Sequence, residues 1–128
     1  MVDHKEIFGI QILEGTEGTQ MGKAGFFCVK DILFIDLWEP KKNYRVPRFH
    51  TRSGVYTVAL TLESCRLGFP NLVSLDNGNL VNLDQVDYID PTAFGIIVRF
   101  KGTNITTSMA QYKEKHFKHL LKENNNSN

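Results

Sequence analysis

The chain has 128 residues, of which 41% are hydrophobic and 23% charged, so it suits one globular domain and excludes wholesale disorder. Fifteen Lys and Arg against fourteen Asp and Glu leave a formal net charge of +1, which excludes a protein coated in positive charge. No apolar run approaches the roughly eighteen residues of a membrane helix, and no apolar signal core follows the charged start. Composition therefore predicts a single cytoplasmic domain that is not inserted in a membrane.

The two cysteines, Cys28 and Cys65, lie far apart and lack CxxC spacing. A chain of this size builds its core without a disulfide, so both are predicted to be reduced, buried thiols. A single bridge between them is the alternative.

The first 23 residues are predicted to be an extension that precedes the domain. One apolar stretch, Phe8–Leu13, is followed by residues 14–23, where three glycines and small polar residues predict a loop. From Gly25 onward, short β-branched and aromatic runs predict strands at 26–29, 32–38, 44–51 and 55–60. Pro47 lacks a backbone donor, which predicts that its strand lies at a sheet edge or carries a bulge.

A short helix is predicted over Thr61–Leu67, with Thr61 as its N-cap and Gly68 at its end. The apolar runs 72–75 and 80–83 flank Asp76–Asn79, and Asn-Gly between such runs predicts a hairpin. The alternative is a loop that presents Asn77 to base edges, where its amide can pair with adenine.

The last third continues with a strand at 86–89, a turn at Asp90–Pro91 and a strand at 94–100. Alternation places Phe94 on one face of that strand, together with residues 96, 98 and 100. After a further strand at 105–107, the sequence Ser108–Gln111 matches a capping box and predicts an amphipathic helix to Leu121. Residues 122–128 are predicted to be a disordered tail, so the overall prediction is a mostly β fold.

Candidate catalytic groups are few, and the chain is predicted not to be an enzyme and to need no cofactor or metal. His116 and His119 lie three residues apart without a nearby Cys, Asp or Glu in a ligand spacing, so a surface role is favoured. Five scattered carboxylates are predicted to cap turns: Asp31, Asp36, Asp84, Asp87 and Asp90.

Positive charge is concentrated between Pro40 and Gly54, a segment without any acidic residue. Its cations are predicted to form a stripe along a phosphate backbone, and arginine also suits guanine edges. The alternatives are a solvated loop or a charged edge that discourages strand addition. The candidate residues of this segment are Lys41, Lys42, Tyr44, Arg45, Arg48 and Arg52, with His50 beside them.

The order of these elements resembles the LytTR family of bacterial DNA-binding domains over about residues 24–121. Asp31–Asp36, which reads DILFID, is similar to the opening strand of that family, and Leu80–Ile89 is similar to its "ylVNl" segment. The helix at Thr61 and the pair Thr107-Ser108 lie where the family has its short helix and its "vSRr" motif.

The resemblance implies an elongated arrangement of small antiparallel sheets with one short central helix and a C-terminal helix. It implies DNA contact through loops, with Tyr44 or its neighbours on the first loop and Asn77 on the second. Met109 and Lys113 would lie at the third contact. The sequence departs from the family where basic or polar contact residues are replaced, which is at Ser74, Asp76, Asn77, Gly78 and Met109.

The leading hypothesis is a sequence-specific transcriptional regulator that contacts double-stranded promoter DNA through loops, without a receiver domain. Lys41, Lys42, Arg45, Arg48 and Arg52 would position it on phosphates, while Tyr44, Asn77 and Lys113 would contact grooves or backbone. Dimers or tandem binding on repeated sites are implied by the resemblance. The alternative is a protein-interaction module of the same fold that has lost DNA binding and binds a protein regulator or a membrane partner protein. A small-ligand domain would need a pocket with convergent polar groups.

Overall fold

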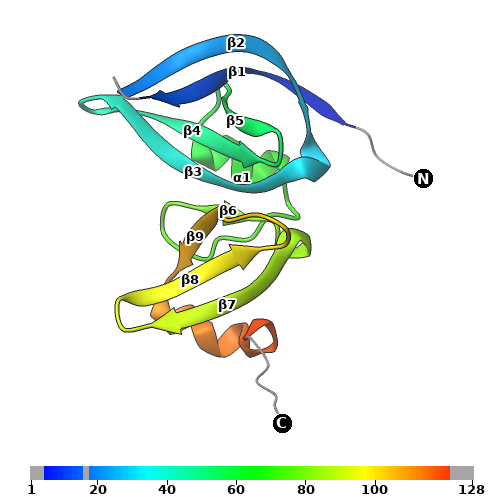
Figure 1. Cartoon of the computed structure of the whole chain (residues 1–128), viewed down its shortest axis with the longest axis vertical. Helices are drawn as coiled ribbons and strands as arrows, with labels where there is room; N and C mark the ends of the chain where they lie inside the picture. The colour runs from blue at the N-terminus through cyan, green and yellow to red at the C-terminus, as the bar shows by residue number, and fades with distance from the viewer. Residues whose placement is uncertain (1–4, 16–17, 122–128) are drawn as a thin grey trace.

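The computed structural model describes residues 5–15 and 18–121, which form two antiparallel sheets stacked along the long axis of the molecule (Figure 1). The six-stranded sheet has the order β2-β1-β5-β4-β3-β6. Its strands are β1 (Glu6–Gly15), β2 (Gly18–Cys28), β3 (Ile32–Lys41), β4 (Tyr44–Thr51), β5 (Gly54–Thr57) and β6 (Leu80–Val81). The three-stranded sheet, of order β7-β8-β9, consists of β7 (Val86–Thr92), β8 (Gly95–Phe100) and β9 (Thr106–Met109). The prediction of a mostly β fold with small antiparallel sheets is confirmed.

Two apolar clusters hold the sheets together. The first joins β3 to the small sheet, where Phe34 stacks on Phe100 with ring centroids 5.5 Å apart. The second lies between the large sheet and helix α1 (Leu62–Gly68), and its centre is the fully buried Phe49. Strand β3 supplies Leu33 and Phe34 to the first cluster and Ile32 and Ile35 to the second, so it links the two clusters.

Helix α1 forms where the sequence predicts it. The Thr61 hydroxyl accepts a hydrogen bond from the Ser64 N–H at 3.0 Å, which satisfies one of the unpaired donors of the first turn. Cys65 faces the core, and burial raises the pKa of its thiol to about 11. Both cysteines are free, in agreement with the prediction, but only Cys65 is buried as predicted, and Cys28 is half-buried.

Replacement of Thr61 by alanine is expected to lower the free energy of unfolding by about 1 kcal/mol, because the N-cap acceptor is lost. Urea denaturation of Thr61→Ala and of the matched Thr61→Ser variant measures the effect. Serine keeps the hydroxyl and should retain most of the stability. Equal losses in the two variants would contradict the capping role.

The described part of residues 14–23 forms strands and not the loop that its glycines predict, while residues 16 and 17 lie outside the described residues. Strand β2 pairs with β1 from Gly18 onward, with Leu13 opposite Gln20 and Ile12 opposite Met21. Since β1 also pairs with β5, the hairpin is part of the large sheet, and its ladder hydrogen bonds outweigh the low β-propensity of glycine.

Strand β4 lies inside the large sheet, so of the two alternatives predicted from Pro47 the edge position is wrong. The pairing of β3 with β4 does shift its register between Trp38 and Lys41, next to the pair of Leu37 and Pro47. The Pro47 carbonyl accepts a hydrogen bond from the Thr57 hydroxyl at 2.9 Å, so this residue turns its hydrogen-bonding side toward β5. The pairing of β4 with β5 begins only at Arg48, opposite Thr57. The missing N–H therefore falls just beyond the end of β5 and interrupts no ladder.

The predicted turn at Asp90–Pro91 is also displaced. Strand β7 continues through both residues to Thr92. Because β7 is an edge strand, it tolerates Pro91, which pairs with Ile96 of β8. The hairpin turn is three residues later, at Ala93 and Phe94.

The predicted C-terminal helix is absent from the described residues. Ser108 belongs to β9, opposite Ile97, and its hydroxyl donates to the Asp76 carboxylate instead of capping a helix. The chain beyond it forms two 3₁₀ segments, η3 (Gln111–His116) and η4 (Lys118–Leu120). Because the Ser108 hydroxyl is bound to Asp76, it does not cap a helix. The segment with helical spacing of apolar residues therefore forms short 3₁₀ turns. The predicted tail, 122–128, lies outside the described residues.

Candidate nucleic-acid interface

Three loops lie along one long side of the molecule, on the left in Figure 1. They are the β3–β4 turn, the turn Asp76–Asn79 and the β7–β8 turn, and the start of η3 adjoins them. A hollow of about 350 Å³ joins Arg45 of the first loop to Gly78 of the second. Another, of about 510 Å³, joins Asp76 to Phe94 and Ser108. We call this side the loop edge; it comprises residues 39–45, 76–79, 92–95 and 108–113.

The β3–β4 turn is a tight reversal between Lys41 and Tyr44, which pair with each other. Asn43 takes a φ of 64°, and its N–H donates to Glu39 Oε2 at 2.9 Å. This bond fixes the turn and leaves Lys41 and Lys42 exposed. Among residues 5–15 and 18–121, neither lysine has an ion-pair partner within 4.0 Å. Tyr44 is 53% exposed beside them.

Arg45 and Arg48 have acidic partners. Arg45 Nε lies 3.6 Å from Glu39 Oε1, in a pair that is largely exposed and therefore weak. Arg48 is bound more firmly, since its Nε and Nη2 each donate at 2.9 Å to the carboxylate of Asp36. The predicted role of Asp36 as a turn cap is wrong, because it lies within β3 opposite Arg48.

The second partner of Asp36 is His50, whose Nε2 lies 3.0 Å from Oδ1 while its ring stacks on Phe34 at a centroid distance of 4.1 Å. Burial by itself raises the pKa of Asp36. The hydrogen bonds and charges of His50 and Arg48 outweigh this effect, so the pKa lies below its ordinary value of 3.8. Asp36, Arg48 and His50 form a half-buried cluster in which the arginine charge is neutralised.

Arg52 lies away from the loop edge. It occupies the β4–β5 turn, at the other end of β4 from Arg45, about 24 Å away for seven extended residues. Its guanidinium donates to Gln85 Oε1 at 2.8 Å. The predicted basic stripe is therefore divided among the loop edge, the middle of β4 and the opposite side.

The turn Asp76–Asn79 exposes Asn77, as the loop interpretation of this segment expects. The Asn77 N–H donates to Asp76 Oδ1 at 2.7 Å, and Ser108 holds the other carboxylate oxygen. The predicted hairpin around the turn is reduced to a single bridge between Val73 and Val81.

Sequence reasoning missed Asn79, which fixes this turn. Its side chain is 2% exposed; the carbonyl accepts from two backbone N–H groups, of Leu75 and Asp76, at 3.2 and 2.9 Å. The amide donates to Thr107 Oγ1 at 3.0 Å and to the Ser108 carbonyl at 2.8 Å. No local signal marks it, because these last partners lie 28 and 29 residues away.

The third contact point contains Lys113, whose Nζ donates to the Ser74 carbonyl at 2.6 Å and lies 6.0 Å from the centre of the Tyr112 ring. This bond ties η3 to the segment that leads into the Asn77 turn. Met109 is 3% exposed and packs in the core, so its side chain does not reach the surface.

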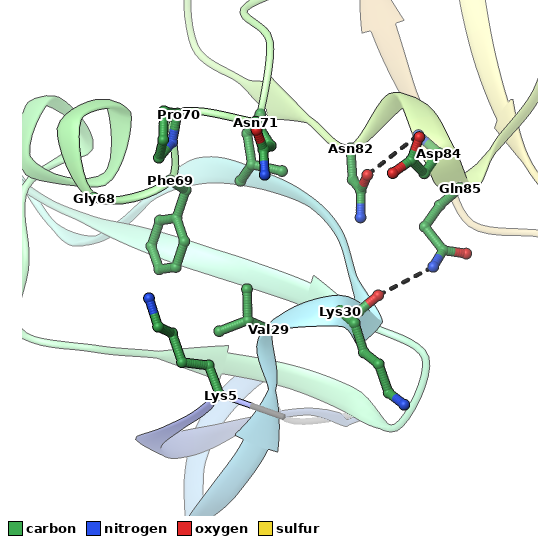
Figure 2. Close-up of a pocket in the computed structure, with 11 residues that line it drawn as sticks. Lys5, Val29, Lys30, Gly68, Phe69, Pro70, Asn71, Asn82, Asp84 and Gln85 are labelled. Carbon is green, nitrogen blue, oxygen red and sulfur yellow. Dashed lines mark hydrogen bonds between the residues drawn. The ribbon is translucent and has the colours of Figure 1, made fainter. Parts of the chain in front are cut away.

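A hollow of about 430 Å³ lies at the junction of the two sheets, away from the loop edge (Figure 2). Its amides serve the fold: Asn82 Nδ2 donates to the Ile32 carbonyl and Gln85 Nε2 to the Lys30 carbonyl, both at 3.0 Å. Within the described part of the chain, no helix could span a membrane, and no three His, Cys, Asp or Glu residues group as a metal site.

No protein-family model and no curated protein matches this sequence. A solved structure from Bacillus cereus, described as a LytTr DNA-binding domain, is similar with a TM-score of 0.56 and 12% identity. The match covers 88% of this chain and 95% of that one. The chain therefore has the LytTR-like fold that its sequence motifs predict.

Proposed function

We propose that this chain is a bacterial DNA-binding protein that regulates transcription, and that it contacts double-stranded promoter DNA through the loop edge. The observation that carries the proposal is the meeting of three loops on one side of a LytTR-like fold. Lys41 and Lys42 would contact phosphates, and Asn77 between the outer loops would read a base edge.

Charge on the loop edge is modest. Four cations, Lys41, Lys42, Arg45 and Lys113, stand against two carboxylates, Glu39 and Asp76. Since Glu39 and Ser74 engage Arg45 and Lys113, the two lysines of the β3–β4 turn supply most of the available charge. We therefore propose two or three phosphate contacts for each molecule, with sequence preference coming from Asn77 and Tyr44. Two copies on a repeated site would double these contacts.

A protein-interaction module is the second candidate. The observation that favours it is the pairing of Arg48 with Asp36 and of Arg45 with Glu39, which removes charge that DNA binding would use. Such a module would bind a protein regulator through the same fold.

Wild-type protein is expected to bind random duplex DNA with a slope of about −2 to −3 in log affinity against log salt. Lys41→Ala/Lys42→Ala should bring the slope to between about 0 and −1, because two phosphate contacts are lost. Fluorescence anisotropy between about 50 and 200 mM salt measures both values.

Arg52→Ala is the matched control, because it removes a cation from the opposite side. Its slope should equal that of wild type. A slope reduced as much by Arg52→Ala as by the lysine variant would move the interface away from the loop edge. Absence of wild-type binding at about 50 mM salt would favour the protein-interaction module.

A further inference from the structure

The tip of the β7–β8 hairpin carries the most exposed apolar side chain among the described residues. Phe94 is 100% exposed, although alternation along the sequence predicts that it shares a face with the buried Ile96 and Val98. Strand β8 begins only at Gly95, so Phe94 lies in the turn and extends beyond the core. A phenylalanine side chain in water forgoes the free energy that its burial would provide, so this ring does not stabilise the fold.

The turn that carries Phe94 is rigidly built. The Phe94 N–H donates to Thr92 Oγ1 at 3.1 Å, and the Thr92 hydroxyl donates to the Gly95 carbonyl at 2.8 Å. Gly95 has a φ of 138°, which a side chain at this position would strain. The ring is therefore held in solvent by an ordered turn whose strands are anchored in the core by Ile89 and Val98.

The tip of the β7–β8 hairpin lies on the loop edge, next to the turn Asp76–Asn79. Phe94 lines the same hollow as Asp76 and Ser108, so it adjoins the turn that exposes Asn77. In Figure 1 the β7–β8 turn projects on the same side as the β3–β4 turn. A duplex that lies along the loop edge would meet Phe94 as well as the polar loops.

We propose that Phe94 is an apolar wedge that enters the minor groove and partly unstacks one base step; this inference rests on the proposed DNA-binding function. Apolar side chains on projecting segments act in this way in proteins that kink DNA. Ala93 and Gly95 flank the ring, so the tip is narrow enough to insert a single side chain. A protein-binding hot spot usually has a rim of further contacts that exclude water, and these small neighbours provide little of it.

The test uses A·T-rich duplex DNA in which 2-aminopurine replaces several adenines, because its fluorescence rises when stacking is lost. Wild type should raise the fluorescence at saturation, whereas Phe94→Ala should not. The variant should bind about tenfold more weakly, since one ring–base contact is lost. Its salt slope should equal that of wild type, because no charge has changed.

Phe94→Trp should retain the signal, and Leu67→Ala, which removes another exposed side chain (77%) on α1, should behave as wild type. If the wild type binds DNA and Phe94→Ala equals it in affinity and fluorescence, the wedge is overturned and the DNA-binding function stays intact. The tip of the hairpin would then suit a protein partner. A changed salt slope in Phe94→Ala would also overturn the wedge, because the turn would then act through the charged loops. Failure of the wild type to bind DNA would overturn the proposed function itself.

Discussion

Replacement of Asn79 by alanine is expected to lower the free energy of unfolding by about 3 kcal/mol and to weaken DNA binding at the same time. The side chain is buried and makes four hydrogen bonds, two from the N–H groups of Leu75 and Asp76 and two to β9. Alanine would leave the Leu75 N–H and the Ser108 carbonyl without these partners, and unsatisfied buried groups are costly. The turn that presents Asn77 would lose its attachment to β9. Urea denaturation and anisotropy with the same protein preparation measure the two effects.

Two variants separate these effects. Asn77→Ala removes an exposed amide from the same turn, so it should leave stability within about 0.5 kcal/mol of wild type. Asn79→Asp keeps the acceptor oxygen for the Asp76 N–H but loses both donors and places an oxygen near the Ser108 carbonyl, so it should be destabilised nearly as much as alanine. A stable Asn79→Ala protein that binds DNA normally would contradict the role of Asn79 as the residue that positions the loop edge.

The strands and helix that sequence analysis predicts correctly have local causes. Ile32–Trp38 and 94–100 contain β-branched and aromatic residues with the spacing of strands, and both runs form the core strands β3 and β8. Thr61 and Gly68 bound α1 because a cap acts within its own helical turn. Features that depend on neighbours in sequence are therefore recovered.

The errors arise where a distant partner competes with a local preference. Ser108 matches a capping box, but Asp76 lies within reach of its hydroxyl, 32 residues away in sequence. Residues 18–23 contain turn-forming glycines, yet β1 provides a strand for them to pair with. Phe94 follows the alternation of β8, although the strand begins one residue later. Local composition does not contain this information, because the decisive contacts are formed between elements.

In the candidate site, too, contacts between elements decide what local sequence does not predict. Five cations close in sequence predict one basic stripe. The extended strand β4 separates Arg45 from Arg52 by its own length, so only the cations near the β3–β4 turn reach the loop edge. Asp36, in the neighbouring strand, neutralises Arg48, and this pairing depends on the register of β3 and β4. Net charge and charge clustering in sequence therefore do not predict how much positive charge remains available to a phosphate backbone.

Asp36→Asn is expected to lower the free energy of unfolding by about 2 kcal/mol at pH 7, because Arg48 and His50 both lose a charged acceptor in a half-buried site. The pKa of Asp36 in the folded protein lies below its ordinary value. The stabilisation is therefore fully present above the ordinary pKa of 3.8 and is lost as the pH falls through the lower folded value. Urea denaturation at pH 7 and at steps down to about pH 3 measures this dependence.

The difference in stability between wild type and Asp36→Asn should shrink over this acid range, because the protonated carboxyl is neutral, as the amide is. Asp87→Asn is the matched control, since it removes an exposed carboxylate from β7, and its stability should stay within about 0.5 kcal/mol of wild type at pH 7. A difference for Asp36→Asn that persists unchanged at acid pH would mean that packing, and not charge, is responsible. Loss of the difference on acidification would show that the carboxylate charge stabilises the cluster.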